Sequence, residues 1–394
     1  MIDNLWHKHQ DKIIAVRRQL HSYPEIAFTE EKTAEVLEGF LHGAGMTEIR
    51  RAARTGVVAA LNGRAGGGRT LAIRADMDAL KVPETTGLPF ASVRSGFMHA
   101  CGHDAHMAMA LGAALILGEM REQWVGTVRF LFQPAEEEIG GAKLMIEEGV
   151  LGQPVVDRIM ALHLFPDLPL GQVGLLDGPI MASNDRFRIK VRGTAAHAAT
   201  PERAVDSIMV AAHIVLTLQS MITREISALD SVVVSFGVSR AGQAYNVIPG
   251  EAELEGTVRT LNPAVRAHLS RRMQEIVEKQ AAVFGAEATV EYIRQYPVTV
   301  NEAGFNRTVA SAAGQIFGPT GVVWLERPSM MAEDFSFFLE QVPGAMVFLG
   351  CGSADPAQLD YPLHHSSFQF DERVLEYGSK LLVRTVLNYL VKGE

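Results

Sequence analysis

Short, mostly apolar segments recur along the chain, separated by longer segments in which apolar residues follow helical spacing. The short segments predict strands buried on both faces, at residues 56–61, 70–75, 125–132, 158–162 and 345–349. The longer segments predict helices, at residues 4–20, 30–42, 104–120, 140–148 and 373–391. Buried strands mixed with helices predict an α/β fold, with a mixed central sheet flanked by helices.

The middle of the chain has a different pattern, in which apolar and charged residues alternate from Asp185 onward. Helices are predicted after Pro201 and Pro263, which gives the order β-α-β-β-α-β of a small split βαβ module. Basic residues of the first strand and glutamates of the third could pair across its wet face. We therefore predict an inserted α+β domain at residues 183–294, which divides a larger domain into segments 1–182 and 295–394.

The glycine-rich segment Gly63–Arg69 resembles a phosphate-binding loop only superficially. It has Arg69 where that motif has lysine, and a predicted strand follows it instead of a helix. We therefore expect a hairpin turn that joins the strands at 56–61 and 70–75.

Charge and cysteine content exclude several classes of protein. The chain has 36 Lys and Arg against 45 Asp and Glu, a net charge of −9, which argues against a nucleic-acid partner. The first residues are charged from Asp3 onward, and no run approaches the roughly 20 apolar residues that span a bilayer. Two cysteines, Cys101 and Cys351, exclude a disulfide framework. We expect a cytoplasmic protein without a membrane partner.

The densest chemical signal is the segment His99–His106, which holds one cysteine and three histidines. Thiolate and imidazole are preferred ligands of zinc-like ions. Cys101 and His103 are two residues apart, so an extended segment before a helix can present both, whereas one helix face cannot. The alternative is a buried loop whose histidines only form hydrogen bonds. Three acids could orient a ligating histidine: Asp76, Asp78 and Asp104. Asp104 could also cap the helix.

A second signal is the run of glutamates 136–138 after the predicted strand at 125–132. Metal-assisted hydrolysis needs one carboxylate as a ligand and a separate one that takes a proton from water. The alternative is a solvated acidic helix start. Three consecutive glutamates leave the assignment of these roles open.

Further histidines follow predicted strands, where ligands collect in open α/β sheets. His163 ends one strand, and the pair His364 and His365 follows another. Each alone could be structural, but together with the cysteine and glutamates they predict a metal centre. His197 could belong to a helix-cap region, and Asn246 could be a turn residue or an amide donor to a substrate. The chain has neither H-E-x-x-H nor G-x-S-x-G, so zincin and serine-hydrolase interpretations lack their signatures.

Seven motifs in this order resemble those of the hippurate hydrolase and indoleacetyl-amino-acid hydrolase group of N-acyl-amino-acid amidohydrolases. They are Arg74–Leu80, Met98–His106, Phe132–Glu137, Ala161–His163, His197–Pro201, Tyr245–Pro249 and Pro362–His364. This group belongs to the superfamily of aminoacylases and zinc carboxypeptidases, and the resemblance covers nearly the whole chain. It implies a catalytic α/β domain with two divalent ions per subunit (Zn, Mn, Co or Ni) and an inserted lid domain that forms a homodimer.

The resemblance also implies a role for each matched residue. The implied metal ligands are Cys101, whose thiolate is a plausible bridge, and His103, Glu137, His163 and His364. Glu136 is implied as the general base. His197 is implied to stabilise the oxyanion in the active site of the partner subunit. Asn246 is implied as a substrate contact, and Arg259 could join it in holding the substrate's α-carboxylate.

The chain departs from the family pattern at several positions. Ala195-Ala196 replaces the usual Gly-Gly, Glu202 a usual His, and Glu138 a usual Gly. His365 follows the last motif histidine and is a rival to His364 as ligand. None of these changes removes a group that the mechanism needs, but they leave substrate preference open.

The predicted function is metal-dependent hydrolysis of N-acyl-L-amino acids, with hippurate-like or N-acetyl substrates, to a carboxylate and an amino acid. One alternative is a metal-dependent dipeptidase or exopeptidase. Another is a non-catalytic metal-dependent binding protein that uses the inserted domain as a clamp. The clamp is disfavoured because binding alone needs no general base such as Glu136.

Overall fold

The computed structural model describes residues 1–394 except 47, 65–67, 139, 354–360 and 393–394. The chain forms two compact units. The host unit comprises Met1–Gly178, Val300–Arg327 and Asp334–Glu394, and the inserted unit comprises Pro179–Thr299 and Pro328–Glu333. Two short strands, β7 (Gly178–Met181) and β14 (Thr299–Asn301), pair where the chain passes between the units.

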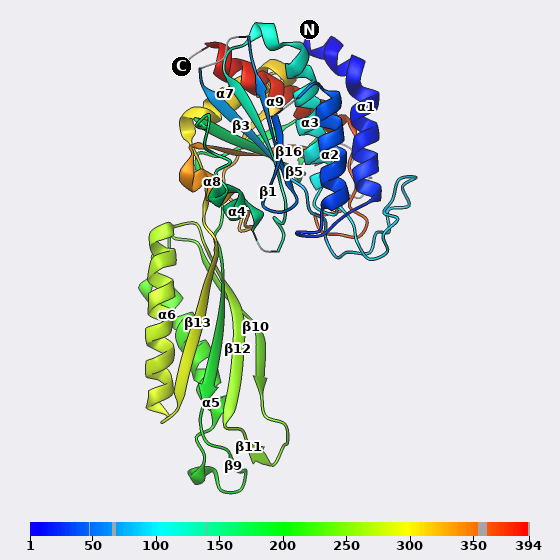
Figure 1. Cartoon of the computed structure of the whole chain (residues 1–394). Coiled ribbons are helices and arrows are strands. Elements are labelled where there is room, and N and C mark those ends of the chain that lie inside the picture. The colour runs from blue at the N-terminus through cyan, green and yellow to red at the C-terminus, as the bar shows by residue number, and fades with distance from the viewer. Residues whose placement is uncertain (47, 65–67, 139, 354–360, 393–394) are drawn as a thin grey trace. The chain divides into compact units, whose positions relative to one another are not determined.

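The host unit is built on an eight-stranded sheet with the order β1-β2-β4-β3-β5-β16-β6-β15 (Figure 1). Its central strands β4, β3, β5 and β16 are parallel, and antiparallel pairs occur toward both edges. The strands are β1 (Glu48–Ala52), β2 (Gly56–Asn62), β3 (Thr70–Asp76), β4 (Thr127–Gln133), β5 (Arg158–Pro169), β6 (Val173–Leu175), β15 (Val322–Trp324) and β16 (Gly344–Gly352). The prediction of a mixed central sheet flanked by helices is confirmed.

The most deeply buried helix of the host unit is α3 (His103–Glu119), whose residues from His103 to Leu117 are all buried. A helix that is apolar on all sides is buried on all sides, and α1 and α9 pack against it. The other helices are α1 (Ile2–Ser22), α2 (Glu31–Gly43), α4 (Gly141–Glu147), α7 (Ala303–Phe317), α8 (Ser336–Gln341) and α9 (Arg373–Lys392), with short 3-10 turns at Arg121–Gln123 and Pro319–Gly321.

Two local expectations are wrong. The strands at 56–61 and 70–75 do not form a hairpin, because β4 lies between β2 and β3, antiparallel to one and parallel to the other. Asp104 does not cap α3. Gly102 occupies the cap position with a left-handed backbone (φ +84°), and the Asp104 carboxylate bonds to Arg17 and His21 instead.

The inserted unit is a four-stranded antiparallel sheet with the order β10-β12-β8-β13 and two helices (Figure 1). Its core lies between the sheet and the helices and includes Phe187, Ile189, Val210, Ile214 and Leu254. The elements in chain order are β8 (Asn184–Arg192), β9 (Ala196–His197), a 3-10 turn (Pro201–Arg203), α5 (Ser207–Glu225), β10 (Val232–Ala241), β11 (Val247–Ile248), β12 (Glu251–Thr260), α6 (Pro263–Val283) and β13 (Glu287–Tyr296).

The other face of this sheet is charged, as the alternation predicts. β8 pairs with β12, and Arg186 and Arg188 of β8 form ion pairs with Glu255 and Glu253 of β12. The expected pairing of a basic strand with an acidic strand is therefore confirmed.

In the described part of the chain, α5 is the helix whose length and composition would suffice to cross a membrane. One side of it contributes Val210, Ile214, Leu218 and Met221 to the core of the inserted unit. A core helix packed on a sheet has this same composition, so the finding adds little evidence for a membrane span.

Candidate metal centre

The sequence-predicted ligands of the host unit come together in the structure. The ligand atoms of Cys101, His103 and His163 lie within 4.8 Å of one another, and so do those of Cys101, Glu137 and His364. The Cys101 Sγ is 3.5 Å from His163 Nε2, and His364 Nε2 is 3.2 Å from Glu137 Oε1. Cys101 belongs to both groups, so its sulfur lies where two neighbouring ions could share it.

Two of the histidines are oriented through their Nδ1 atoms. His103 Nδ1 donates to the backbone oxygen of Asp78 at 2.8 Å, and His163 Nδ1 donates to that of Leu164 at 2.8 Å. When the ring is neutral, as it must be to bind an ion, these bonds leave Nε2 with its lone pair, the arrangement typical of a ligating histidine. His103 Nε2 is buried and makes no hydrogen bond. This unpartnered atom shows that the residues present fit a metal ion.

The charges around these histidines favour a cation. Burial opposes the charged form of His103, but Asp76 and Asp78 outweigh it and raise the pKa of His103 to about 10. Burial and the neighbouring His106 lower the pKa of His163 to about 3, so that ring is neutral. Burial raises the pKa of the Cys101 thiol, and nearby carboxylates raise it further. A divalent ion would reverse this last effect, since metal coordination deprotonates a thiol.

The turn after β4 separates the roles of the three glutamates. Asp78 accepts the backbone N–H of Glu136 on one carboxylate oxygen and that of Glu137 on the other, both at 3.0 Å. Glu138 points to the surface, where it pairs with Lys81 at 2.8 Å. Glu136 is 6% exposed, and Glu137 lies beside His103 and His364. The structure therefore brings Glu136 and Glu137 to the centre and leaves Glu138 outside it.

His364 and His365 have different surroundings. The backbone of His364 is left-handed (φ +68°), and its N–H donates to the Ala100 oxygen at 2.8 Å, next to Cys101. His365 stacks on Tyr361 at a centroid distance of 4.5 Å, and its Nδ1 accepts the Ser367 N–H at 3.0 Å. The structure therefore places His364 beside Glu137, whereas the His365 ring contacts Tyr361 and Ser367.

The three acids expected to orient the ligands have different contacts. Asp78 holds His103 through its backbone oxygen and also holds the glutamate turn. Asp76 bonds His106 instead of a candidate ligand, with 2.6 Å between Oδ1 and Nδ1. Asp104 accepts from Arg17 Nε and His21 Nδ1, both at 2.8 Å, and these bonds connect α3 to α1.

Sequence reasoning missed a buried network beside the glutamate turn. Arg74 donates to Asp76 at 2.6 Å and to Asp334 at 2.9 Å, and Asp334 also accepts from Gln133 at 2.8 Å. The backbone N–H of Asp334 lies 3.4 Å from Glu136 Oε1. A usable signal was present, because an arginine within a fully buried strand requires buried partners.

The remaining predicted residues belong to the inserted unit. His197 is exposed on β9, which pairs with β11, and its Nδ1 accepts the Ala199 N–H at 3.1 Å. Asn246 precedes β11, and its backbone oxygen accepts the Ala198 N–H at 3.0 Å. The structure thus brings His197 and Asn246 onto adjacent segments. Arg259 lies on β12 and donates to the Met330 oxygen at 2.9 Å.

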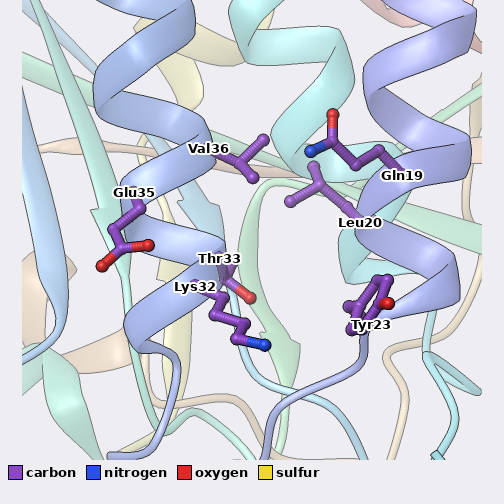
Figure 2. A pocket seen from close by; sticks show the side chains of 7 residues that line it. All are labelled: Gln19, Leu20, Tyr23, Lys32, Thr33, Glu35 and Val36. Atoms are coloured by element: carbon purple, nitrogen blue, oxygen red, sulfur yellow. The ribbon is translucent and has the colours of Figure 1, made fainter.

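A surface pocket of about 260 Å³ lies elsewhere in the host unit, between α1 and α2 (Figure 2). Leu20 and Val36 face each other across it, and the Lys32 ammonium lies 5.4 Å from the Tyr23 ring centroid. None of its lining residues is a candidate ligand, base or substrate contact. The candidate site therefore depends on the convergence of ligand atoms and not on this cavity.

An α/β sheet with a cysteine, histidines and paired glutamates gathered beside its strands defines a metal-dependent hydrolase. The chain belongs to peptidase family M20/M25/M40, whose model matches residues 72–388. It is 39% identical to N-acetylcysteine deacetylase of Bacillus subtilis, over 96% of both chains, and 36% identical to IAA-amino acid hydrolase ILR1-like 4 of Arabidopsis thaliana, over 97% of this chain and 86% of that one. The Bacillus subtilis YXEP protein, described as a dinuclear metal binding peptidase, superposes with a TM-score of 0.85 at 36% identity, over 98% of this chain and 99% of that one.

Proposed function

We propose that this M20 hydrolase cleaves the amide bond of N-acyl-L-amino acids, with N-acetyl or hippurate-like acyl groups, to a carboxylate and an amino acid. The observation that carries the proposal is the buried Glu136 beside two ligand groups that share Cys101. The names of two relatives, a deacetylase of N-acetylcysteine and a hydrolase of IAA-amino acids, support an acylated amino acid as substrate.

The proposed centre holds two divalent ions, Zn, Mn, Co or Ni. Cys101, His103 and His163 would hold one of them, and Cys101, Glu137 and His364 would hold the other, since the ligand atoms of each group lie within 4.8 Å of one another. When bound, the ions lower the pKa of a water molecule and polarise the scissile carbonyl. The chain's own contribution is the orientation of these side chains through Asp78, Leu164 and Ala100.

Glu136 is the proposed general base. Its backbone is held by Asp78, and one of its carboxylate oxygens lies 3.4 Å from the Asp334 N–H. In this position the carboxylate takes a proton from water and passes it to the leaving amine.

His197, Asn246 and Arg259 are proposed to act on the substrate. The Ala199 N–H occupies Nδ1 of His197, so its proton is on Nε2 and can be donated to an oxyanion. The net charge of −9 does not attract an anionic substrate, so the α-carboxylate needs a local donor. Asn246 and the Arg259 guanidinium are the proposed donors, and because they lie toward opposite ends of β12, one substrate would meet Asn246 of one subunit and Arg259 of the other. A cytoplasmic location and the lack of a nucleic-acid partner stay predictions.

The inserted unit is the proposed dimer interface. β10 is an edge strand of its sheet, and α5 exposes apolar side chains, with Ile208 47%, Met209 50% and Leu216 64% exposed. We expect light scattering to show a dimer in the wild type and a monomer for Leu216→Glu. Leu229→Glu, at a 96% exposed loop position, is the control and stays dimeric. A Leu216→Glu dimer would contradict this interface.

The proposed activity is tested with benzoylglycine, acetyl-amino acids and a free-amine dipeptide, before and after chelation and metal add-back. We expect metal-dependent cleavage of the blocked substrates. Glu136→Gln should abolish turnover while the metal content per chain is unchanged, because the variant loses the base and keeps every ligand. A fully active Glu136→Gln enzyme would refute the assignment of the base.

A dipeptidase is the second candidate, because the similar YXEP protein is described as a peptidase. Preferential cleavage of the free-amine dipeptide would favour it. A metal-loaded protein that cleaves none of the panel would instead favour a metal-dependent binding protein.

A further inference from the structure

We propose that His106 is a positioning residue for the metal centre, and that it acts on His163 through the backbone of Leu164. The inference rests on the proposed two-metal function. His106 is 3% exposed and lies on α3, three residues after His103. Its ring centroid is 4.8 Å from that of His163. A third histidine so close to the centre looks like a further ligand, and its contacts decide whether it is one.

Both nitrogens of His106 are already engaged. Nδ1 is 2.6 Å from Asp76 Oδ1, and Nε2 accepts the Leu164 N–H at 3.0 Å. Nε2 must therefore carry the lone pair and Nδ1 the proton, which defines the tautomer. Neither nitrogen has a lone pair left for an ion.

The bond to Leu164 replaces a missing strand contact. β3 pairs with β5 from Leu71 opposite Arg158 to Arg74 opposite Ala161, and the pairing ends there. Leu164 lies three residues beyond this end. Its N–H is bonded by the side chain of His106, in the part of β5 that β3 no longer covers.

Leu164 in turn contacts His163 and also the segment that carries Cys101 and His103. Its backbone oxygen accepts from His163 Nδ1 at 2.8 Å. Its side chain packs on Gly102, where an added Cβ would come within 2.8 Å of Leu164 Cδ1. Gly102 separates Cys101 from His103. A shift of Leu164 would therefore change the orientation of His163 and loosen the packing beneath the other two members of the group.

The contacts that lead to Leu164 start from a buried ion pair between Arg74 and Asp76. Arg74 donates to Asp76 Oδ2 at 2.6 Å, which leaves Oδ1 to accept from His106. Each link from Arg74 through Asp76 and His106 to Leu164 thus joins a donor to an acceptor. A fully satisfied buried network of this kind has one arrangement and holds its members rigidly.

Two substitutions separate this role from a general effect on folding. His106→Asn places an amide near the Nδ1 position and keeps the contact with Asp76, but it cannot reach Leu164. His106→Gln reaches the Nε2 position and keeps an acceptor for the Leu164 N–H. Both keep a buried amide in α3. His9→Gln, at a histidine that pairs with Glu119 on the outer side of α1 and α3, is the control.

The readout is the affinity for Zn²⁺ in competition with a chelator, with circular dichroism to confirm folding. We expect His106→Asn to weaken the binding of one of the two ions by roughly 10- to 100-fold, the usual effect of losing an orienting partner. His106→Gln should stay within about threefold of wild type, and His9→Gln should not differ from it. Equal losses in the Asn and Gln variants, or none in either, would overturn the proposal.

This measurement is independent of amide hydrolysis. If the wild type binds two ions and cleaves none of the substrates, the proposed function is wrong. The relative Zn²⁺ affinities of the His106→Asn and His106→Gln variants still test the role of His106. A wild type that binds no divalent ion would overturn both.

Discussion

At the scale of single residues, the backbone decides which of several equivalent side chains reaches the centre. Three glutamates follow one another, and the left-handed backbone of Ala135 (φ +56°) together with the two bonds to Asp78 directs Glu136 and Glu137 inward. The choice of His364 over His365 likewise depends on a left-handed residue bonded to Ala100. Residue types could be predicted from the sequence. Residue type and spacing alone left these choices open, because they depend on contacts with residues far away along the chain, and only the resemblance to the family motifs implied them.

The buried carboxyl of Glu30 predicts how the free energy of unfolding depends on pH. Burial is the main reason that its pKa is raised to about 7, although Thr55 and Ala135 donate hydrogen bonds to it. A carboxyl with a raised pKa binds its proton more tightly in the folded state than in the unfolded state. The free energy of unfolding should therefore fall as pH rises from about 4.5 to about 7, where Glu30 is ionised in the unfolded state and still protonated in the folded state, and should level off above about 7.

Chemical denaturation of wild type and Glu30→Gln at pH 5 and pH 8 checks this prediction. Because glutamine cannot ionise, the stability of the variant relative to wild type should increase between the two pH values. A difference that is the same at both pH values would show that Glu30 does not titrate in this range.

At the scale of elements, the hydrophobic pattern predicts where strands and helices lie but not which strands pair. Each of the five predicted apolar segments overlaps a strand of the central sheet. The predicted hairpin between β2 and β3 is wrong because β4 lies between them in the sheet. β4 reaches this place through a crossover connection that contains the buried helix α3, and such a connection is not visible in the local pattern. Local patterns carry little information about such crossovers.

Close packing of α9 against α3 predicts that a side chain at Gly378 destabilises the protein. A Cβ at this position would lie 1.9 Å from Met109 Sδ of α3. We expect Gly378→Ala to lower the free energy of unfolding by about 1–3 kcal/mol, the usual effect of overpacking. Gly39→Ala on α2, where a Cβ meets no atom within 4 Å, should be neutral or stabilising by up to about 1 kcal/mol. Equal effects in denaturant titrations would contradict this account.

At the scale of the whole molecule, each unit has a hydrophobic core of its own, and all five proposed ligands belong to the host unit. We expect calorimetry of the chelated protein to show two transitions. Zn²⁺ at a hundred times its Kd should stabilise one of them by about 2.7 kcal/mol for each ion bound and leave the other unchanged. A single transition, or an equal shift of both, would contradict the independence of the two units.

The order of segments along the chain also has a consequence for biosynthesis. A ribosome that has reached residue 178 has made four of the five proposed ligands, whereas His364 is still to come. At that point β5 pairs only with β3, and the edge that later receives β16 is open. The whole of the inserted unit is then synthesised before β16 can close that edge. An open apolar strand edge invites pairing with other chains, so during this interval the nascent protein exposes an aggregation-prone edge and lacks one of the five proposed ligands.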